Sequence, residues 1–399
     1  MNEACDDGYG KTRLMLVTRN LPPLRGGMER LNLHMALELA TAFDLDVIGP
    51  SGCGAELPKG IHAQEAPHRP MWRFLPIVFV RALRLARKRR PACIIAGSGL
   101  TAPIAWIAAR VSGAHAVVYV HGLDLVATHP VYRLLWRPFL RRMDLCIANS
   151  RPTADVAASI GIPADRIVVL NPGVELPVLV DAAAAAEFRR RHGLGERKLM
   201  LSVGRLTPRK GLLEFVEQSM LSITDAHPDA TLLVIGDEAP DALIGSAAGM
   251  GQRIMQAARV IGLQDNIRIL GICDEADLSA AYQASNALVF PVRSVPGDVE
   301  GFGMVAIEAA AHGLATVAFA VGGVSDAVAD GKSGWLVPAG DYAQFANRVS
   351  RVFEKQPIEV MQAECRRYAQ GFSWDVFGRQ LRELIKPFAD SQIRRREAR

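Results

Sequence analysis

Residues 198 to 211 read KLMLSVGRLTPRKG, an apolar run that reaches a glycine and passes into a short loop containing arginine and lysine. An apolar run of this length is typical of a buried strand, and the glycine and proline after it mark a turn. The stretch therefore predicts a strand that ends in a basic loop.

Short apolar runs alternate with longer helical patterns on both sides of this stretch. Strands are predicted at 13–18, 45–49, 92–96, 115–120 and 145–149, and again at 230–236, 267–271, 287–291 and 315–320. Buried strands that alternate with helices form parallel sheets. An alanine-rich segment separates the two series, so we expect an α/β fold of two doubly wound, Rossmann-like halves that face a central cleft.

The length of the chain also favours two domains. It has 399 residues, of which 50% are hydrophobic and 22% are charged, and this is more than one ordinary domain holds. We place an N-terminal domain at 1–175, a second at 176–372, and a C-terminal helix with a basic tail at 373–399. This helix is expected to cross back to the first domain and to end near Pro387, before a solvated, frayed tail.

Cysteine usage and the start of the chain favour a cytoplasmic protein. The six cysteines show no C-x-x-C or metal-type spacing, and no cleavable signal peptide opens the sequence. The uncharged stretch 91–109 is long enough to span a bilayer. It contains GSG and a central proline, however, so we predict a strand, a turn and a helix there.

Two glycine motifs look like nucleotide-binding loops. GSGLTA (97–102) has the G-x-G-x-x-A form of the dinucleotide fingerprint, but it does not follow the first strand of its domain, and the nearest acid, Asp124, is not at the usual spacing. Tight strand-to-helix packing explains its glycines equally well. GYGKT (8–12) lacks a preceding strand, and we expect it to belong to a disordered leader.

The basic loop is the first candidate for ligand binding. Arg205 and Lys210 lie five residues apart, and a guanidinium with a mobile ammonium suits a diphosphate leaving group. Gly26 and Gly27 precede another predicted helix, whose first amides could meet a phosphate. A solvated surface for the first pair and a simple turn for the second remain alternatives.

A second candidate is the stretch DVEGFGMVAIEAAAHG at 298–313. Glu300 lies in its glycine turn, and Glu308 lies in the second turn of a helix that begins at Met304. A buried carboxylate requires hydrogen-bond donors, which ribose hydroxyls, a backbone cap or an arginine could supply. His121, at the tip of a predicted strand, could share a proton with a ligand or serve a structural role.

The order of these motifs, together with NPGV (171–174) and VGGVSDAV (321–328), resembles the retaining nucleotide-sugar glycosyltransferases of family 4. Their two Rossmann-like domains form the arrangement called GT-B. The resemblance spans about residues 13–385. Within it, the stretch GDVEGFGMVAIEA (297–309) is most similar to bacterial mannosyltransferases.

The resemblance implies a role for each candidate. Arg205 and Lys210 would hold the diphosphate, His121 would lie near the sugar and acceptor, and Glu300 would contact the donor sugar without acting as the nucleophile. The implied substrate-binding residues are Gly26, Gly27, Phe302, Gly303, Met304, Val305 and Glu308. No metal and no cofactor besides the nucleotide-sugar substrate is implied.

The implied reaction moves a hexose from GDP-mannose or a UDP-hexose to a lipid-linked or saccharide acceptor, in cell-envelope polysaccharide, lipopolysaccharide or glycolipid synthesis. A GT-B epimerase or phosphorylase is an alternative. An NAD-dependent oxidoreductase built on GSGLTA is a more distant one.

Two basic segments predict a membrane partner. Residues 71–90 contain seven basic residues and no acid, and residues 131–142 contain four arginines with Trp136 and Phe139. Basic residues interleaved with aromatic ones are typical of interfacial helices, so we expect peripheral binding to the anionic inner face of the cytoplasmic membrane. Ordinary surface helices are the alternative. No nucleic-acid-binding module accompanies these segments, so nucleic acid is not an expected partner.

Overall fold

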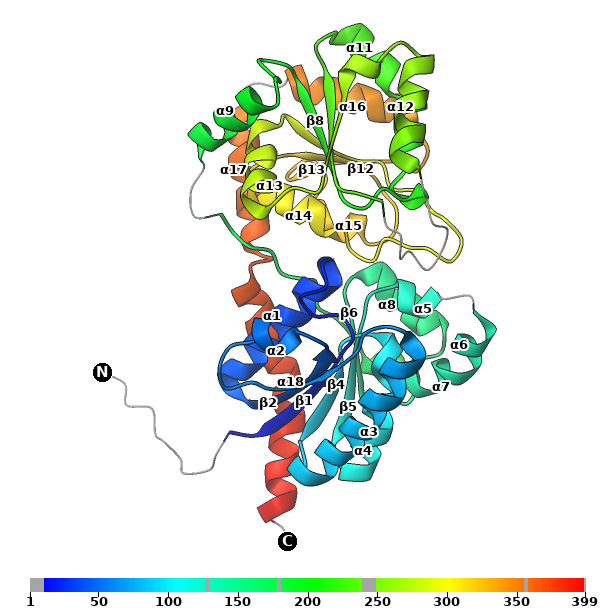
Figure 1. Ribbon diagram of the computed structural model, residues 1–399, viewed down its shortest axis with the longest axis vertical. Helices are drawn as coiled ribbons and strands as arrows, with labels where there is room; N and C mark the ends of the chain where they lie inside the picture. The colour runs from blue at the N-terminus through cyan, green and yellow to red at the C-terminus, as the bar shows by residue number, and fades with distance from the viewer. Residues whose placement is uncertain (1–10, 127–128, 178–180, 239–248, 355–357, 398–399) are drawn as a thin grey trace, which may run out of the picture. The chain divides into compact units, whose positions relative to one another are not determined.

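The computed structural model describes residues 11–126, 129–177, 181–238, 249–354 and 358–397. They form unit 1 (residues 1–171 and 374–399) and unit 2 (residues 172–373), each with its own parallel sheet (Figure 1). The two predicted doubly wound halves are confirmed. Residues 8–10 of the GYGKT motif lie outside the described residues, so the expectation for that motif stays a prediction.

Unit 1 contains a seven-stranded sheet in the order β3-β2-β1-β4-β5-β6-β7, and all neighbouring strands are parallel. The strands are β1 (Arg13–Val17), β2 (Asp44–Pro50), β3 (His62–Ala66), β4 (Cys93–Ala96), β5 (His115–Val120), β6 (Leu145–Ala148) and β7 (Ile167–Val169). The edge strand β3 was not predicted because its sequence, HAQEA, lacks an apolar run. Strand order reverses between β1 and β4, which is where α/β sheets bind ligands.

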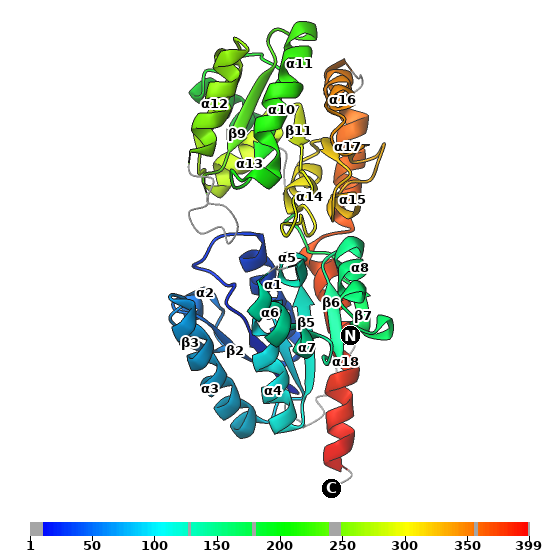
Figure 2. The same ribbon diagram turned by 90° about the vertical axis from the view of Figure 1, so that its right-hand side faces the viewer.

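The helices of unit 1 pack on the faces of this sheet (Figure 2). They are α1 (Gly27–Ala42), α2 (Cys53–Glu56), α3 (Met71–Arg89), α4 (Ala102–Ser112), α5 (Leu123–Val126), α6 (Pro130–Leu135), α7 (Arg137–Leu140), α8 (Arg151–Ser159) and α18 (Trp374–Glu397), with short 3-10 turns η1 (Gly99–Thr101) and η2 (Ala164–Arg166). Val17, Ala96 and Val118 are fully buried at the centre of its core.

The C-terminal helix does not end at Pro387, contrary to the prediction. α18 continues to Glu397, although proline removes a backbone hydrogen bond from a helix. Packing explains the difference: Ile385 and Ala389 are buried on either side of the proline. Beyond it, the Phe388 ring lies 5.0 Å from that of His115, and Ser391 Oγ lies 2.9 Å from His115 Nε2. Tertiary contacts of this kind supply most helix stability in proteins.

Unit 2 contains a six-stranded parallel sheet in the order β10-β9-β8-β11-β12-β13. Its strands are β8 (Leu199–Val203), β9 (Thr231–Ile235), β10 (Ile267–Gly271), β11 (Ala287–Phe290), β12 (Thr316–Phe319) and β13 (Gly334–Val337). Strand order reverses between β8 and β11. The loops that follow these two strands therefore lie at the switch point of this sheet.

Helices of unit 2 enclose one hydrophobic core on each face of the sheet (Figure 2). They are α9 (Ala182–Arg191), α10 (Leu212–Gln218), α11 (Met220–Ala226), α12 (Met250–Val260), α13 (Glu275–Ala284), α14 (Met304–Ala311), α15 (Val324–Ala327), α16 (Tyr342–Glu354) and α17 (Ile358–Gln370), with η3 (Pro208–Lys210) and η4 (Gln264–Asn266).

The uncharged stretch 91–109 folds as predicted, into strand β4, the turn η1 and the start of α4. Its apolar residues line the core of unit 1. In the described parts of the chain, no helix combines the length and the apolar character needed to cross a bilayer.

Candidate active site

Two loops at the switch point of unit 2, together with helix α14 that follows the second loop, carry most of the predicted site residues. Strands β8 and β11 are adjacent and parallel, so their carboxyl ends meet at one edge of the sheet. A Cβ atom at Gly211, in the first loop, would lie 1.9 Å from the carbonyl oxygen of Pro291 in the second. The close approach of the loops therefore requires glycine at this position.

Lys210 and Glu300, which were predicted from separate motifs, are in direct contact. Nζ of Lys210 donates to Oε2 of Glu300 at 2.8 Å. Arg209 donates to the same oxygen, and its Nε lies 2.9 Å from Oδ1 of Asp298. The side chains of Arg209, Lys210 and Glu300 are only 11%, 18% and 13% exposed. Two cations and two carboxylates thus form a largely buried ion cluster, which we call the Arg209 cluster.

The Arg209 cluster keeps Glu300 ionised. Burial acts to raise the pKa of this carboxyl, but the charges of Lys210 and Arg209 and their hydrogen bonds outweigh it and lower the pKa to about 2. Burial lowers the pKa of Lys210, and the Glu300 carboxylate opposes that shift. At neutral pH, Glu300 is therefore an acceptor of hydrogen bonds rather than a proton donor.

The lowered pKa leads to a pH prediction. A folded-state pKa of about 2, against an ordinary value of 4.5, means that the ion pairs of Glu300 stabilise the fold above about pH 5 and lose this effect as the pH falls towards 2. We expect Glu300→Gln to lower the free energy of unfolding by about 3 kcal/mol at neutral pH and by less in acid. Urea unfolding of both proteins between pH 7 and pH 3 measures this. A difference that does not change with pH would contradict the ion-pair account.

A third loop, between β12 and α15, fixes the backbone of Glu300. The amide of Gly323 donates to the Glu300 carbonyl oxygen at 2.9 Å. A Cβ atom at Gly322 would lie 2.6 Å from that oxygen, and one at Gly323 would lie 2.0 Å from the oxygen of Gly301. Any side chain here would displace the Glu300 turn, which explains the paired glycines of VGGVSDAV.

Helix α14 begins directly after the Glu300 turn. Gly303 is its N-cap with φ of +98°, a left-handed conformation that favours glycine. Phe302 is buried, and Met304 and Val305 form the first turn of the helix. Because Gly303 has no side chain to cap the helix, the first amides of α14 can bind an anion.

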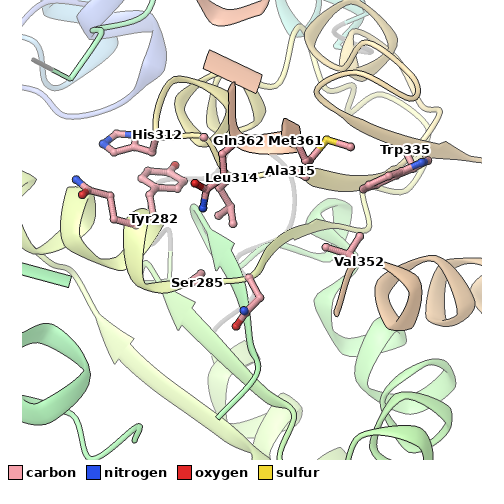
Figure 3. Close-up of a pocket in the computed structure, with 12 residues that line it drawn as sticks. Tyr282, Ser285, His312, Leu314, Ala315, Trp335, Val352, Met361 and Gln362 are labelled. Atoms are coloured by element: carbon pink, nitrogen blue, oxygen red, sulfur yellow. The ribbon is translucent and has the colours of Figure 1, made fainter. Parts of the chain in front are cut away.

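Glu308 lies one turn further along α14 and is 9% exposed. Its Oε2 accepts a hydrogen bond of 3.0 Å from the hydroxyl of Tyr282 on α13, so this buried carboxylate has the donor that was expected. The ring of Tyr282 stacks on that of His312, with centroids 4.9 Å apart (Figure 3). Sequence inspection missed Tyr282 because it lies 26 residues before Glu308.

Arg205 lies on the same loop as Lys210 but outside the Arg209 cluster. Its side chain is exposed, whereas Arg209 and Lys210 are largely covered. The loop thus divides its basic residues between an internal ion cluster and a position open to a ligand. Arg209 was not predicted, although it stands beside Lys210 in PRKG. Asp298 was not predicted either, although it stands two residues before Glu300.

In unit 1, the predicted residues connect through Gly97. Gly26 is the N-cap of α1 with φ of +154°, and Gly27 begins the helix. Asn32 on this helix donates to the carbonyl oxygen of Gly97 at 3.2 Å. His121, at the end of β5, is 7% exposed and places Nε2 at 2.9 Å from the same oxygen. The GSGLTA motif therefore joins the start of α1 to His121.

A pocket in unit 2 lies away from these loops. It is lined by residues that precede β11 and β12, including Asn286 and Leu314, and by Trp335 and Met361 (Figure 3). It therefore lies at the amino ends of these strands, opposite the Arg209 cluster. Tyr282 and His312, which lie beside Glu308, line it, but none of the predicted site residues does. The loops at the carboxyl ends of the strands therefore identify the candidate site better than this pocket does.

Family comparisons assign both halves of the chain. Residues 185–372 match the family described as Glycosyl transferases group 1, and residues 25–177 match Glycosyltransferase Family 4. The chain belongs to glycosyltransferase family 4. The resemblance inferred from the motifs is thereby confirmed.

Individual relatives of this glycosyltransferase cover between about two thirds and nearly all of its length. A GDP-mannose-dependent alpha-(1-6)-phosphatidylinositol monomannoside mannosyltransferase of Mycolicibacterium smegmatis is 27% identical over 391 residues, which cover 93% of the chain and 98% of the relative. A D-inositol 3-phosphate glycosyltransferase of Salinispora arenicola is 30% identical over 298 residues, which cover 69% of the chain and 64% of the relative.

Solved structures support the fold. Anabaena HepE in complex with UDP-glucose aligns with a TM-score of 0.78 at 19% identity, covering 94% of this chain and 99% of that one. The GT-B fold expected for this glycosyltransferase is therefore confirmed.

Proposed function

We propose that this glycosyltransferase is a retaining hexosyltransferase that moves a hexose from a nucleoside diphosphate sugar to a lipid-linked or saccharide acceptor. The supporting observation is the basic loop after β8, which carries exposed Arg205 and the Lys210 ammonium held by Glu300, at the carboxyl edge of the unit 2 sheet where α14 begins without a side-chain cap. Cationic side chains and helix amides together suit a diphosphate that leaves with negative charge. Cell-envelope polysaccharide, lipopolysaccharide or glycolipid synthesis is the setting that fits such a product.

The donor diphosphate is assigned to Arg205 and Lys210. An ammonium group has three protons, and the hydrogen bond from Lys210 to Glu300 uses one of them, so two can meet phosphate oxygens. Arg205 adds an exposed guanidinium from the same loop. In unit 1, the start of α1 at Gly26 and Gly27 offers further amides to a phosphate.

The nucleoside and the sugar are assigned to α14 and the turn before it. The carboxylate of Glu308 accepts hydrogen bonds from ribose hydroxyls while Tyr282 holds one of its oxygens. Glu300 and the backbone of residues 302–305 contact the hexose. His121 is assigned to the sugar and acceptor hydroxyls.

The configuration of the anomeric carbon is retained if the acceptor attacks from the same face of the sugar from which the diphosphate departs. The acceptor oxygen bonds to the anomeric carbon while the carbon–oxygen bond to the diphosphate breaks, and the leaving phosphate oxygen takes the acceptor's proton. Lys210 stabilises the charge that develops on that oxygen. Two cations neutralise Glu300, which makes it a weak nucleophile and disfavours double displacement. A hexosyl adduct trapped on Glu300 would reverse this preference.

The names of two relatives guide the choice of substrates. One is a GDP-mannose-dependent enzyme, and both names contain an inositol group on the acceptor side. We therefore propose GDP-mannose as the first donor to test and a UDP-hexose as the second. Phosphorylated inositol, free or in a lipid, is the first acceptor class.

A donor panel tests this function. Purified protein is incubated with GDP-mannose, UDP-glucose and UDP-galactose, with and without EDTA, and with methyl α-mannoside, D-inositol 3-phosphate or phosphatidylinositol vesicles. We expect release of GDP or UDP with transfer that EDTA does not abolish, and NMR of the product should show the α-anomer. Epimerised nucleotide sugar, or sugar 1-phosphate formed only with added phosphate, would instead support the epimerase or phosphorylase alternative.

The contacts of the GSGLTA motif do not support the alternative of an NAD-dependent oxidoreductase. The amide of Gly99 donates to Oδ2 of Asp124 at 2.8 Å and is not directed to a ligand. A Cβ atom at Gly97 would lie 1.9 Å from Oδ1 of Asn32. Close packing therefore accounts for both glycines. NAD should not raise the melting temperature of this protein, whereas GDP or UDP should.

We also propose that unit 1 binds anionic membrane surfaces, with its peripheral position on the inner face of the cytoplasmic membrane. Much of the apolar stripe of α3 packs into the core, as Phe74 and Val78 show, but Trp72 is 68% exposed. On α6, Leu134 is 74% and Leu135 52% exposed. These side chains, with the neighbouring arginines and lysines, suit the lipid interface.

Vesicle binding tests this placement. Replacing Arg84, Arg87 and Lys88 with glutamine removes three exposed charges from α3, at about 1 kcal/mol each near an anionic surface. We expect this variant to bind phosphatidylglycerol vesicles at least about 10-fold more weakly in co-sedimentation. The control removes the same charge from unit 2, at Arg259, Lys332 and Arg351. Equal binding by the two triple variants would contradict the placement on unit 1.

A further inference from the structure

The acid nearest to the GSGLTA motif, Asp124, bonds to two loops at once. Its Oδ1 accepts from the amide of His121 at 2.9 Å, and its Oδ2 accepts from the amide of Gly99 at 2.8 Å. The first bond alone would be an ordinary local contact at the start of α5. The second reaches a loop 25 residues away, so the carboxylate ties the end of β5 to the end of β4.

The glycines of GSGLTA permit this arrangement. A Cβ atom at Gly99 would lie 3.0 Å from Cβ of Asp124 and 2.9 Å from the hydroxyl of Tyr132. At Gly97, a Cβ atom would meet Thr18 at 2.7 Å. Side chains at these positions would push the β4 loop away from His121 and Asp124. The motif thus serves His121 rather than a dinucleotide.

Geometry also fixes the tautomer of His121. Its Nε2 lies 2.9 Å from the carbonyl oxygen of Gly97, and a carbonyl oxygen can only accept, so Nε2 carries the proton. In the neutral form of the ring, Nδ1 is then the acceptor. The side-chain amide of Asn149 lies 3.4 Å from the His121 carbonyl oxygen, and the His121 ring lies 5.2 Å from that of Tyr119. His121 therefore has contacts through both its backbone and its ring.

We propose that Asp124 is a positioning residue that, with Gly97, holds His121 so that Nδ1 accepts a hydrogen bond from a substrate hydroxyl. The inference rests on the proposed function only in that it takes His121 to meet the sugar or acceptor. Asp124 itself touches no substrate. Its effect is exerted through the backbone of His121 and the β4 loop.

The test replaces Asp124 with asparagine. The amide oxygen of asparagine can accept from one of the two backbone N–H groups. Its NH₂ group then faces the other backbone N–H group, and two donors cannot form a hydrogen bond. We expect kcat/KM for the acceptor found in the panel to fall about 10- to 100-fold, because a small displacement of a reacting group has effects of this size. If that hydroxyl belongs to the acceptor, the KM for the donor should stay within about twofold; if it belongs to the donor sugar, the donor KM should rise as well. Asp155→Asn, at an exposed position on α8, is the matched control.

Histidine NMR supplies a readout that a general loss of stability does not mimic. Long-range ¹H–¹⁵N spectra should show His121 as the Nε2–H tautomer, assigned by its loss in His121→Gln, and should show mixed tautomers in Asp124→Asn. Gly99→Ala, which crowds Asp124 but keeps its charge, should behave like Asp124→Asn. Unchanged acceptor kinetics and tautomer in Asp124→Asn would overturn the proposal, as would loss of the fold in both variants.

The same experiment separates this inference from the proposed function. If His121→Gln leaves the acceptor kinetics unchanged, the role assigned to His121 is wrong. If His121→Gln impairs transfer but Asp124→Asn does not, only the positioning role of Asp124 is wrong.

Discussion

Lys210→Ala is expected to lower kcat by about 100- to 1,000-fold, because the ammonium group stabilises charge that appears on the leaving diphosphate only in the transition state. The position of Lys210 supports this expectation, since Glu300 holds its Nζ at 2.8 Å and its side chain is 18% exposed. An anchored ammonium needs little reorganisation when the donor bond breaks. The donor KM should change less than kcat does.

Single-turnover transfer from the donor identified in the panel measures this effect separately from product release. Lys332→Ala, an exposed lysine of the same unit, is the control and should behave like wild type. A Lys210→Ala variant that retains normal turnover would show that the leaving group is stabilised elsewhere.

Arg209→Met is expected to lower the free energy of unfolding by about 3 kcal/mol, which is the scale for removing one partner from a buried ion pair. Arg209 is 11% exposed and contacts the carboxylates of both Asp298 and Glu300. Without it, Asp298 loses this ion-pair partner, and Lys210 is left to neutralise Glu300. The expected loss is large because the remaining charges stay in a poorly solvated place.

Arg205→Met is the matched control on the same loop. Arg205 is exposed and lies outside the Arg209 cluster, so its loss should change stability by no more than about 0.5 kcal/mol while weakening nucleotide binding. Urea unfolding of the two variants, with nucleotide titrations beside it, makes the comparison. Equal free energies of unfolding for the two variants would mean that the Arg209 cluster does not stabilise the fold.

The sequence predicted most of the fold because most strands of both sheets are short, largely apolar runs. Runs such as ACIIA and ATLLVIG are typical of strands that are buried on both faces of a sheet. The edge strand β3 escaped prediction because its polar residues give no such signal, and the short edge strands β7 and β13 were not predicted either. Pro387 was misjudged because its local cost is offset by the packing of Ile385 and Ala389, which no local rule contains.

The candidate site was predicted as a set of residue types but not as a set of contacts. Lys210 and Glu300 were found because each stands in a glycine-containing loop after a strand. That they touch depends on the adjacency of β8 and β11, and strand order is a property of the whole sheet. Asp124 and Tyr282 were missed for the same reason, since each acts on a residue or loop in a separate part of the chain.

Nucleotide binding at Glu308 tests the central claim that α14 of unit 2 binds the ribose of the donor. Calorimetry compares GDP and UDP with their 2′,3′-dideoxy forms on wild type and Glu308→Gln. We predict that wild type binds the preferred ribonucleotide about 10- to 100-fold more tightly than its dideoxy form, since hydrogen bonds to a charged group are worth about 1.5–3 kcal/mol. Glu308→Gln should lose most of that difference. A variant that keeps the full preference for the ribonucleotide would contradict the account.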